Sequence, residues 1–442
     1  MGVVKASSWR RDHEPVCHDT HRRDAASILF NLPGYRVITA SRRADGQRVV
    51  LIETTAGEDG CPSCGVMSNR VHSRPVQQVR DVSCGGQPVV VRVRKRRYLC
   101  AEQVCPRGTF TEVTEELPAR ARVTTRLAAT VAGALRTEPR AVLGVAGEHG
   151  LSWTTVMRLA TQTLDVDGHA DSRLVRRLGI DEHRFRKVRY VRDADIGATV
   201  RVEPWSVVFT DLDTGAILDV VDGPRAAAVK SWLRARPRWW RKRVETVAID
   251  MSSEFRSAVR EVLPKAKISV DHWHVIRLAN QMLTDVRRRR AWEVHGRRGR
   301  LIDPPWRYRK LLTCAGDRLS VRQRERLQEI LEADIELAVA WGIKEHVRQL
   351  MATRDTAAFQ RAWSELEKAV RATRLPEPRR LFKTLSAWRR ELLTFCRTRT
   401  TNARTEAANL TAKTFKRIGR GYRNHDNYRC RIMAYTTSPK AA

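Results

Sequence analysis

The stretch VETVAIDMSSEFRSAVREVLPKAKISVDHWH, residues 244–274, decides the fold of this chain. A short apolar run, Val244–Asp250, leads into a helical pattern over Ser253–Leu263, and a second apolar run, Lys267–Asp271, follows. Short apolar runs that alternate with a helical pattern are typical of strands in an α/β sheet. Each run ends in an aspartate, so the stretch also places two carboxyl groups at strand ends.

The segment upstream of this stretch extends the same sheet. Three further β-rich runs come first, and a second helical pattern, Arg225–Arg236, separates them from the quoted stretch. The order is therefore three strands, a helix, a strand, a helix and a strand, which predicts a mixed α/β sheet. The three upstream runs are Leu178–Asp181, Trp205–Asp211 and Ala216–Val221.

The segment downstream is helical and charged. From about residue 274 to residue 397 the pattern is helical throughout, and a last helical pattern runs from Asn402 to about Arg420. We expect residues 274–397 to form an all-α domain inserted into the α/β domain. Five tryptophans are scattered through it, namely Trp292, Trp306, Trp341, Trp363 and Trp388.

The charge of the chain indicates a polyanionic partner. Lys and Arg total 83 and Asp and Glu total 49, which gives a formal net charge of +34 at pH 7. An enzyme of small molecules needs no such field, whereas each phosphate that basic residues neutralise releases counterions. Since the basic residues run along the whole chain, we expect nucleic acid as the partner, with an anionic membrane surface as the alternative. The arginine-rich insertion is then expected to clamp DNA and to help assembly.

The chain has no membrane or export signal in its sequence. No apolar run approaches the ~18 residues that a membrane helix needs. The first residues are polar and charged and lack the apolar region of a signal peptide. We therefore expect a cytoplasmic, nucleoid-associated protein. In that compartment its nine cysteines are expected to be metal ligands or free thiols rather than disulfide partners.

Four cysteines form two closely spaced pairs. Cys61-x-x-Cys64 is followed by Gly65, which suits a tight knuckle turn, and Cys100-x4-Cys105 comes later. Two such pairs brought together by the fold supply the four soft ligands of a tetrahedral Zn²⁺ ion. Because four thiolates leave no open position for a substrate, we expect the zinc to be structural. Cys84 is a possible substitute ligand, and the lone thiols are Cys17, Cys314, Cys396 and Cys430.

Residues 139–158 have the layout of a helix-turn-helix. Pro139 can begin a first helix, Gly150 can make the turn and Ser152 is a good N-cap for a second helix. An ordinary helical hairpin is the alternative, but the zinc module and the charge favour DNA binding. In the second helix Val156 and Leu159 face inward, whereas Trp153, Thr154, Thr155 and Arg158 face outward, with Thr155 and Arg158 expected to contact DNA.

Three acids have a distinctive context. Asp181 and Asp250 each end a short apolar strand, where open sheets place their sites, and neighbouring strands would bring the two carboxylates together. Glu406 lies in a predicted helix whose polar residues recur at steps of four and three, on one face. Such oxygen ligands suit two Mg²⁺ (or Mn²⁺) ions that clamp both oxygens of a phosphoryl displacement. The polar face consists of Asn402, Glu406, Asn409, Lys413 and Arg417.

Asp271 and His274 leave three roles open. Asp271 ends the last strand-like run, and His274 lies almost one helical turn further on. The pair could be metal ligands, a phosphate contact or a stabilising pair. We favour a supporting role, because Asp250 already occupies a strand end.

Taken together, these motifs resemble the DDE transposases of bacterial insertion sequences, in particular the ISL3 family. The resemblance covers roughly residues 30–435. It implies a ribonuclease-H-like core, an all-α insertion before the catalytic glutamate, and metal-dependent cutting and joining of DNA. It also implies that Asp181, Asp250 and Glu406 bind the catalytic metal ions. The quoted motifs are Cys-Pro-x-Cys-Gly, Gly-Ile-Asp181-Glu, Ile-Asp250-Met, Val-Asp271-His-Trp-His274-Val and Asn402-x3-Glu406-x2-Asn409-x3-Lys413-x3-Arg417-x3-Gly421-Tyr-Arg-Asn.

The sequence therefore predicts a multidomain α/β plus α protein. We expect it to bind the terminal inverted repeats of an element and target DNA, as a homodimer, with Lys413 and Arg417 on DNA and with Asp271, His274, Asn402 and Asn409 in support. A DNA-binding regulator with an inactive core and a structure-specific nuclease remain as rivals. The expected parts are a disordered leader (1–27), a zinc-binding domain (28–118), a helix-turn-helix domain (119–168), the catalytic core (172–273 and 398–435) and the insertion (274–397).

Overall fold

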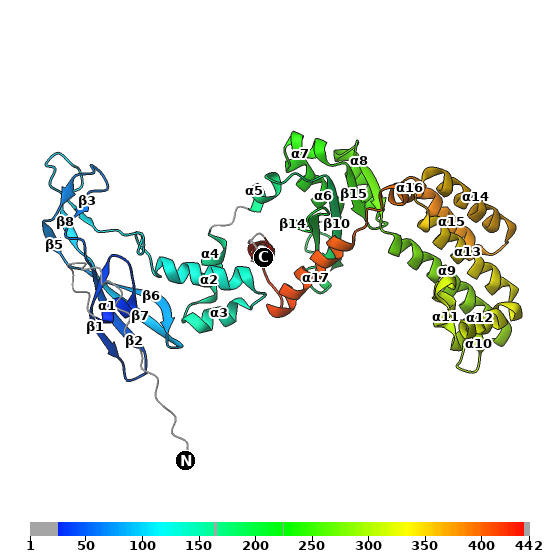
Figure 1. Cartoon of the computed structure of the whole chain (residues 1–442), viewed down its shortest axis with the longest axis horizontal. Helices are drawn as coiled ribbons and strands as arrows, with labels where there is room; N and C mark the ends of the chain where they lie inside the picture. Colours follow the sequence, from blue (N-terminus) through cyan, green and yellow to red (C-terminus); the bar gives the residue numbers. More distant parts are fainter. Residues whose placement is uncertain (1–24, 163–165, 224, 437–442) are drawn as a thin grey trace, which may run out of the picture. The chain divides into compact units, whose positions relative to one another are not determined.

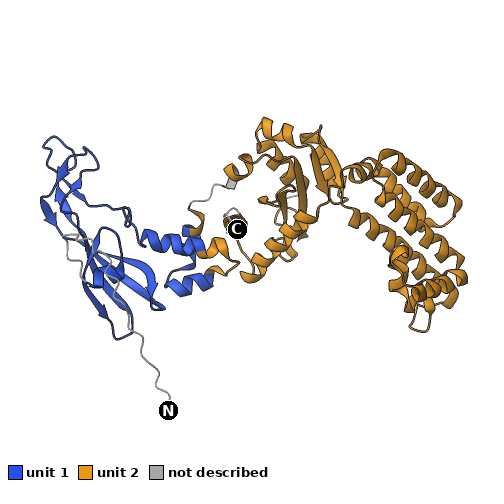
Figure 2. Cartoon of the chain, viewed as in Figure 1, with its two compact units in different colours: residues 1–133, 143–159 blue, residues 134–142, 160–442 orange. Residues whose placement is uncertain are grey.

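The computed structural model describes residues 25–162, 166–223 and 225–436 (Figure 1). The chain divides into two compact units, one of residues 1–133 and 143–159 and one of residues 134–142 and 160–442 (Figure 2). Most of the leader predicted to be disordered lies outside the described residues. Its last three residues, however, begin helix α1 (Ala25–Phe30), because the Ser27 hydroxyl accepts a hydrogen bond from the backbone of Val37 and so ties the segment to β1.

The first unit contains a four-stranded sheet in the order β1-β2-β7-β6 and two smaller sheets. Apolar side chains from alternate positions of these strands, Ile52, Val79, Val91 and Val93 among them, form its core. The four strands are β1 (Tyr35–Arg42), β2 (Arg48–Thr54), β6 (Val76–Cys84) and β7 (Gln87–Arg94). The smaller sheets contain β3 (Asp59–Gly60), β4 (Met67–Ser68), β5 (Val71–Ser73), β8 (Arg97–Leu99) and β9 (Thr109–Thr111).

The basic strand predicted over Pro88–Arg97 is two strands. It breaks after Arg94, and β8 then pairs with β5 and β9 in another sheet. The arginines in and beside β7 are also engaged inside the protein, since Arg94 donates two hydrogen bonds of 2.9 and 2.6 Å to buried Glu53. This strand therefore joins the two sheets, and Arg94 serves an ion pair.

Three helices follow the sheets. They are α2 (Thr125–Thr137), α3 (Val142–His149) and α4 (Trp153–Thr161). The first helix of the predicted motif begins at Val142 and not at Pro139, because the chain makes a short turn in which the Arg140 backbone N–H donates to the Glu138 carbonyl.

The second unit contains a five-stranded sheet in the order β14-β13-β10-β15-β16. β13 pairs antiparallel with both β10 and β14, whereas β10, β15 and β16 pair in parallel, so β13 alone runs against the other four strands. The predicted mixed sheet is thereby confirmed. Its strands are β10 (Arg177–Arg184), β13 (Trp205–Asp211), β14 (Ile217–Asp222), β15 (Thr246–Ile249) and β16 (Lys267–Val270).

Helices cover both faces of this sheet (Figure 1). Successive residues of a strand point to opposite faces. Val207 and Phe209 of β13 accordingly pack with α6 to α8, whereas Val208 packs with α17 and α18. The late helices α17 and α18 thus return to a sheet built mainly by residues 177–270. The helices of this part are α5 (Val166–Asp171), α6 (Arg225–Ala235), α7 (Arg238–Arg243), α8 (Ser253–Val262), α17 (Ala403–Ile418) and α18 (His425–Thr436).

Residues between β16 and α17 are helical, as predicted. They contain no strand within the described residues, and the core of these helices is continuous with that of the sheet. No helix in the described part of the chain is both long and apolar enough to span a membrane. The elements are α9 (His272–His295), α10 (Pro304–Arg307), α11 (Arg309–Thr313), η1 (Gly316–Arg318), α12 (Val321–Ala333), α13 (Ile335–Ala352), α14 (Thr356–Ala372), α15 (Pro376–Ala387) and α16 (Arg389–Thr398).

Candidate active site and zinc site

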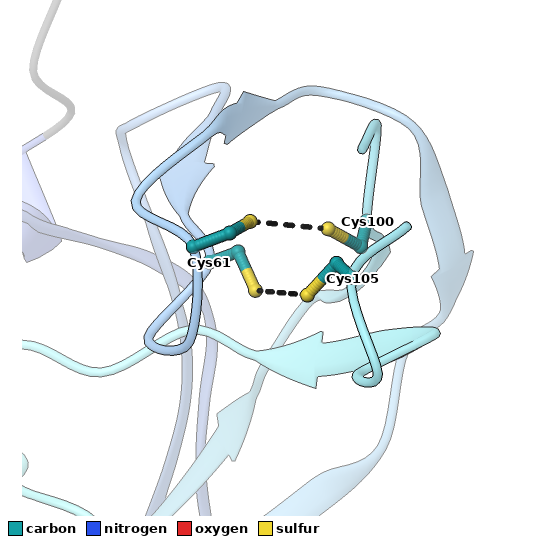
Figure 3. A group of neighbouring side chains, drawn as sticks. Cys61, Cys100 and Cys105 are labelled. Carbon is teal, nitrogen blue, oxygen red and sulfur yellow. Dashed lines mark hydrogen bonds between the residues drawn. The ribbon is translucent and has the colours of Figure 1, made fainter. Parts of the chain in front are cut away.

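The four paired cysteines converge in the first unit. Their sulfur atoms all lie within 4.8 Å of one another. The Sγ atoms of Cys61 and Cys105 are 3.9 Å apart, and those of Cys64 and Cys100 are 3.6 Å apart (Figure 3). A tetrahedral zinc ion at about 2.3 Å from each sulfur requires sulfur–sulfur distances of about 3.8 Å. The group therefore fits one Zn²⁺ ion.

Local backbone geometry holds the first knuckle. Gly65 has a positive φ of +76°, and its N–H donates to the Cys61 carbonyl at 2.7 Å, which closes the turn. A residue with a Cβ would be strained there. Cys84 lies at the end of β6 and is not a member of the sulfur group, so the structure does not favour it as a substitute ligand.

The helix-turn-helix segment has its predicted cap and turn. Gly150 has a φ of +62° between α3 and α4, and the Ser152 hydroxyl accepts a hydrogen bond of 3.2 Å from the Thr155 N–H. Val156 and Leu159 are buried, and Arg158 is exposed. Thr155 is only half-exposed, and its hydroxyl lies 2.9 Å from that of Ser152.

Asp181 and Asp250 come from neighbouring parallel strands. β10 pairs with β15 up to Ile180 and Ile249, so the next residue of each strand is an aspartate. Contrary to the prediction, Asp181 does not end its strand, because residues 182–184 stay paired with β13. It lies instead where the parallel pairing with β15 stops, beside Asp250.

The two carboxyl groups affect each other. Burial raises the pKa of Asp181 to about 7, and the negative charge of Asp250 adds to the effect. Burial likewise raises the pKa of Asp250, although His274, whose Nε2 lies 3.3 Å from its Oδ2, and Asn402 oppose the rise. Two partly buried like charges of this kind favour either a shared proton or a bound cation.

Helix α17 contacts both carboxyl groups through its two asparagines. The Asn402 side-chain amide donates to Asp250 Oδ1 at 3.4 Å, and that of Asn409 donates to Asp181 Oδ2. Both asparagines are buried, with exposures of 0% and 2%. Glu406 lies between them on the same face of the helix, one turn from each, and its own side chain is exposed. Lys413 and Arg417 continue this face outward and are exposed.

A glycine in β10 allows this close contact. A Cβ atom at Gly179 would lie 2.0 Å from Thr405 Oγ1 and 2.7 Å from Leu212 Cδ2. Both distances are impossible for real atoms, so Gly179 is what lets the first turn of α17 lie against the sheet. The Asn402 amide also reaches the Ile180 carbonyl at 3.3 Å.

Asp271 has a different environment from the other two aspartates. One of its oxygens accepts from the Trp273 N–H at 2.8 Å, which caps α9, and the other accepts from the Asn402 N–H at 3.0 Å. Although burial opposes ionisation, hydrogen bonds from His272 and from these backbone groups lower its pKa. Asp271 therefore fixes the start of α17 to the start of α9.

Two residues that the sequence reasoning did not select extend the network behind Asp181. His183 is buried, and its Nδ1 lies 3.0 Å from Asn409 Oδ1, while its Nε2 lies 2.8 Å from the Tyr428 hydroxyl. Burial lowers the pKa of His183 to about 4, so the ring is neutral. Since the Asn409 amide oxygen only accepts, Nδ1 carries the proton. The ring thus orients Asn409 toward Asp181.

Glu182 has a third carboxyl group near Asp181 and Asp250, and the sequence reasoning did not select it either. Burial raises its pKa to about 7, although Arg225, whose Nε lies 2.8 Å from its Oε2, opposes the rise. The sequence did carry signals for these residues. Glu182 follows Asp181 directly, and His183 is two residues on, where strand alternation places it on the same face as Asp181.

Three family models match the chain in consecutive order. The zinc-finger of transposase IS204/IS1001/IS1096/IS1165 matches residues 58–105, and the helix-turn-helix domain of transposase family ISL3 matches residues 112–163. The transposase model of the same family, of the DDE type, matches residues 178–432, which are more than half of the chain. The chain belongs to the ISL3 family of transposases.

A curated relative supports this assignment. The transposase for insertion sequence element IS1001 of Bordetella parapertussis is 26% identical over 387 residues, which are 87% of this chain and 90% of that protein. The ISL3 transposase model spans the strands with Asp181 and Asp250 and the helix with Glu406. Membership implies an enzyme of transposition that binds DNA, and the zinc-finger match with the four clustered cysteines supports a structural Zn²⁺ ion.

Proposed function

We propose that this ISL3-family chain binds the terminal inverted repeats of an insertion sequence, hydrolyses DNA at the element ends and joins the freed 3′-OH to target DNA. The observation that carries the proposal is the pair of neighbouring carboxyl groups, Asp181 and Asp250, with α17 docked across them. A strand order of β14-β13-β10-β15-β16 with only β13 reversed supports a ribonuclease-H-like core over residues 172–273 and 398–435.

The donor set at this site fits divalent cations. Asp181 and Asp250 are partly buried acids that lie close to each other, and carboxylate oxygens are the ligands that Mg²⁺ and Mn²⁺ prefer. Glu406 lies on the same face of α17 as the two asparagines that contact the aspartates, and we propose that its exposed side chain supplies the third carboxylate. A bound pair of such ions would supply charge stabilisation for the attacking and leaving oxygens.

The remaining residues of the site hold these acids in place. Asn402 and Asn409 each donate to one aspartate, and Asp271 fixes the backbone at Asn402. His274 contacts Asp250 from the first turn of α9. With the carboxylates oriented in advance, the reaction needs less reorganisation around the phosphate. Exposed Lys413 and Arg417 on α17 would hold the DNA backbone nearby.

The decisive experiment replaces each proposed acid by its amide. Asp181→Asn, Asp250→Asn and Glu406→Gln should lower cleavage and strand transfer of a labelled end duplex in Mg²⁺ by orders of magnitude, while DNA binding persists. Asp271→Asn is the matched control. Because Asp271 accepts from two backbone groups, its loss should lower stability by about 1–3 kcal/mol and activity far less.

The outcomes separate the proposal from its rivals. If all three amide variants cleave normally, the assignment of the triad is wrong. If the cleavage is also traced to a contaminant, a DNA-binding regulator with an inactive core becomes the better account. A protein that cuts branched DNA but never joins ends would be a structure-specific nuclease. If Asp271→Asn abolishes catalysis and Asp250→Asn does not, the second carboxylate has been assigned to the wrong strand.

The helix-turn-helix is proposed to read the element ends through Thr155 and Arg158, in a complex of two chains with paired ends. Arg158 is exposed on α4 behind the Ser152 cap. Arg158→Ala should weaken binding of the end sequence by about 1–3 kcal/mol and leave binding of unrelated duplex nearly unchanged, as measured by anisotropy. An equal loss on both duplexes would reduce Arg158 to a phosphate contact.

A further inference from the structure

A pocket in the helical insertion gathers positive charge and aromatic rings. It encloses about 570 Å³ between the end of α9, the loop after it, and helices α10 and α11. None of its lining residues is acidic. Four are arginines and two are tryptophans, namely Arg287, Arg288, Arg298, Arg309, Trp292 and Trp306.

Arg287 is buried there without a counter-charge. Its exposure is 8%, and burial, together with the neighbouring arginines, lowers its pKa. Within the described residues its guanidinium has no ion pair or hydrogen bond. The last two arginines of the run Arg287–Arg290 differ, since Arg289 bonds Glu377 at 2.7 Å and Arg290 bonds Asp334 at 3.0 Å. The guanidinium nitrogens of Arg287 are not among the fully buried polar atoms and so open onto the pocket, where an anion would supply the missing counter-charge.

The two tryptophans of the pocket are not equivalent. Trp306 packs so closely on Gly299 that a Cβ there would lie 2.9 Å from its ring, and Arg309 lies 4.1 Å over the ring centre. Trp306 is thus held in place by its neighbours. Trp292 is 61% exposed, and no aromatic or cationic side chain among the described residues covers its ring. Its indole is therefore available to a planar partner.

We propose that this pocket binds one unstacked nucleotide of a DNA strand, with a phosphate against the guanidinium groups and the base stacked on Trp292. Guanidinium groups match phosphate geometry, and unpaired bases stack readily on aromatic side chains. A base inside a duplex has both faces covered and cannot use such a ring. The assignment rests on the proposed function and deepens it, because it names the form of DNA that the insertion recognises.

The test uses the full-length zinc-loaded protein without Mg²⁺, so that no DNA is cut. The probe is an end duplex with a short single-stranded overhang that carries the fluorescent base 2-aminopurine at successive unpaired positions, beside a blunt duplex. Stacking on Trp292 should quench the fluorescence at one position. Trp292→Ala should abolish this quenching, and Arg298→Gln should weaken overhang binding about tenfold with little effect on the blunt duplex.

Matched variants control for surface charge and for tryptophan content. Arg361→Gln removes an exposed arginine of α14, and Trp239→Ala removes an exposed tryptophan of α7. Neither should change the quenching or the preference for the overhang. Arg287→Met keeps an unbranched apolar stem and removes the charge. It should lower overhang affinity, while the melting temperature of the unbound protein does not fall.

Each result bears on the pocket alone. Equal losses on overhang and blunt duplex would overturn the assignment to an unpaired nucleotide, and so would quenching that survives Trp292→Ala. Because the assay needs neither metal-dependent cleavage nor the proposed acids, the pocket assignment can fail while the amide variants still support catalysis. The reverse result would leave the pocket as a nucleotide site on a protein without the proposed reaction.

Discussion

The carboxyl group of Asp181 is buried beside Asp250, and its pKa rises to about 7, whereas that of Asp271 is lowered by the N–H groups that it accepts from. Both residues follow similar apolar runs, and their surroundings alone divide their roles. An acid that resists ionisation in the free protein gains most when a cation binds. An acid that is fully bonded to backbone groups has little left to offer a metal ion.

This difference predicts how stability depends on pH. The folded-state pKa of Asp181 lies above the ordinary value of 3.8, so its contribution to stability is present below that value and is lost as the pH rises through about 7. Without Mg²⁺, the melting temperature should therefore fall between about pH 4 and pH 7, and Asp181→Asn should reduce that fall. The variant should keep part of this pH dependence, because the pKa of Glu182 is also raised to about 7.

Added Mg²⁺ should reverse the trend, because the metal competes with the proton for the same oxygens. The rise in melting temperature on adding Mg²⁺ should be larger at about pH 8 than at about pH 5, and absent in Asp181→Asn. The protein must keep its zinc at every pH of this measurement, so that the change in melting temperature reports on Mg²⁺ alone. An unchanged pH profile in Asp181→Asn would contradict the pKa assignment.

At the scale of elements, the docking of α17 on β10 assembles the site. Gly179, which contacts Thr405, is only two positions before Asp181 in β10. A small displacement of the helix would therefore move both asparagines off the carboxyl groups. The geometry of the site therefore depends on how precisely α17 packs on β10.

Gly179→Ala should expose this dependence. The added methyl group would overlap Thr405 and Leu212, and overpacking of this kind costs about 1–3 kcal/mol. Urea unfolding should show this loss, and cleavage should fall further than stability explains. Gly342→Ala in α13 is the matched control, because a Cβ there meets nothing within 4 Å. Adding Thr405→Ala should partly rescue Gly179→Ala, and independent effects of the two changes would argue against a direct clash.

Most elements were predictable from the sequence, and those that were missed lack a clear apolar pattern for different reasons. The strands of the five-stranded sheet carry continuous apolar runs, and all five were located. β11 (Arg189–Arg192) and β12 (Thr199–Val202) form a two-stranded ribbon whose residues are all exposed, so they have no apolar face to reveal them. α18 was missed because its apolar residues are interspersed with arginines, one of which, Arg431, is buried and bonds the Leu135 carbonyl.

The site was predictable only in part for a physical reason. Strand-end acids and a helical polar face are local patterns, and they drew attention to the aspartates and to α17. Contacts between distant segments are not local. The bond between His183 and Tyr428 joins residues 245 apart, and the fit of Thr405 against Gly179 depends on how closely two elements approach. No periodicity in the chain encodes either of them.

At the scale of the whole molecule, the two compact units have separate cores. The cysteine group and the apolar residues next to it, Tyr98 and Phe110, lie in the first unit, and the five-stranded sheet lies in the second. Loss of zinc should therefore disrupt the small sheets near the cysteines and leave the second unit folded. The charge of +34 adds a strong salt dependence to any DNA binding.

Cys100→Ser should test this independence. Elemental analysis should find about one zinc per chain in the wild type and much less in the variant, because three thiolates remain. Hydrogen exchange should rise in residues 59–111 and stay unchanged in the strands β10, β13 and β15. Cys84→Ser, which alters a thiol outside the group, is the control. Full zinc content in Cys100→Ser would exclude that residue as a ligand.

The long separation between β10 and α17 has a consequence for synthesis of the protein. Asn402 reaches back over 222 residues to Ile180, and Glu406 follows it. A ribosome therefore releases the zinc-binding segment, the helix-turn-helix and both proposed aspartates long before the helix that orients them. A nascent chain, or one shortened by a premature stop codon before residue 402, should occupy DNA without cutting it. Such fragments would compete with the full-length protein for the same ends and restrain its activity in the cell.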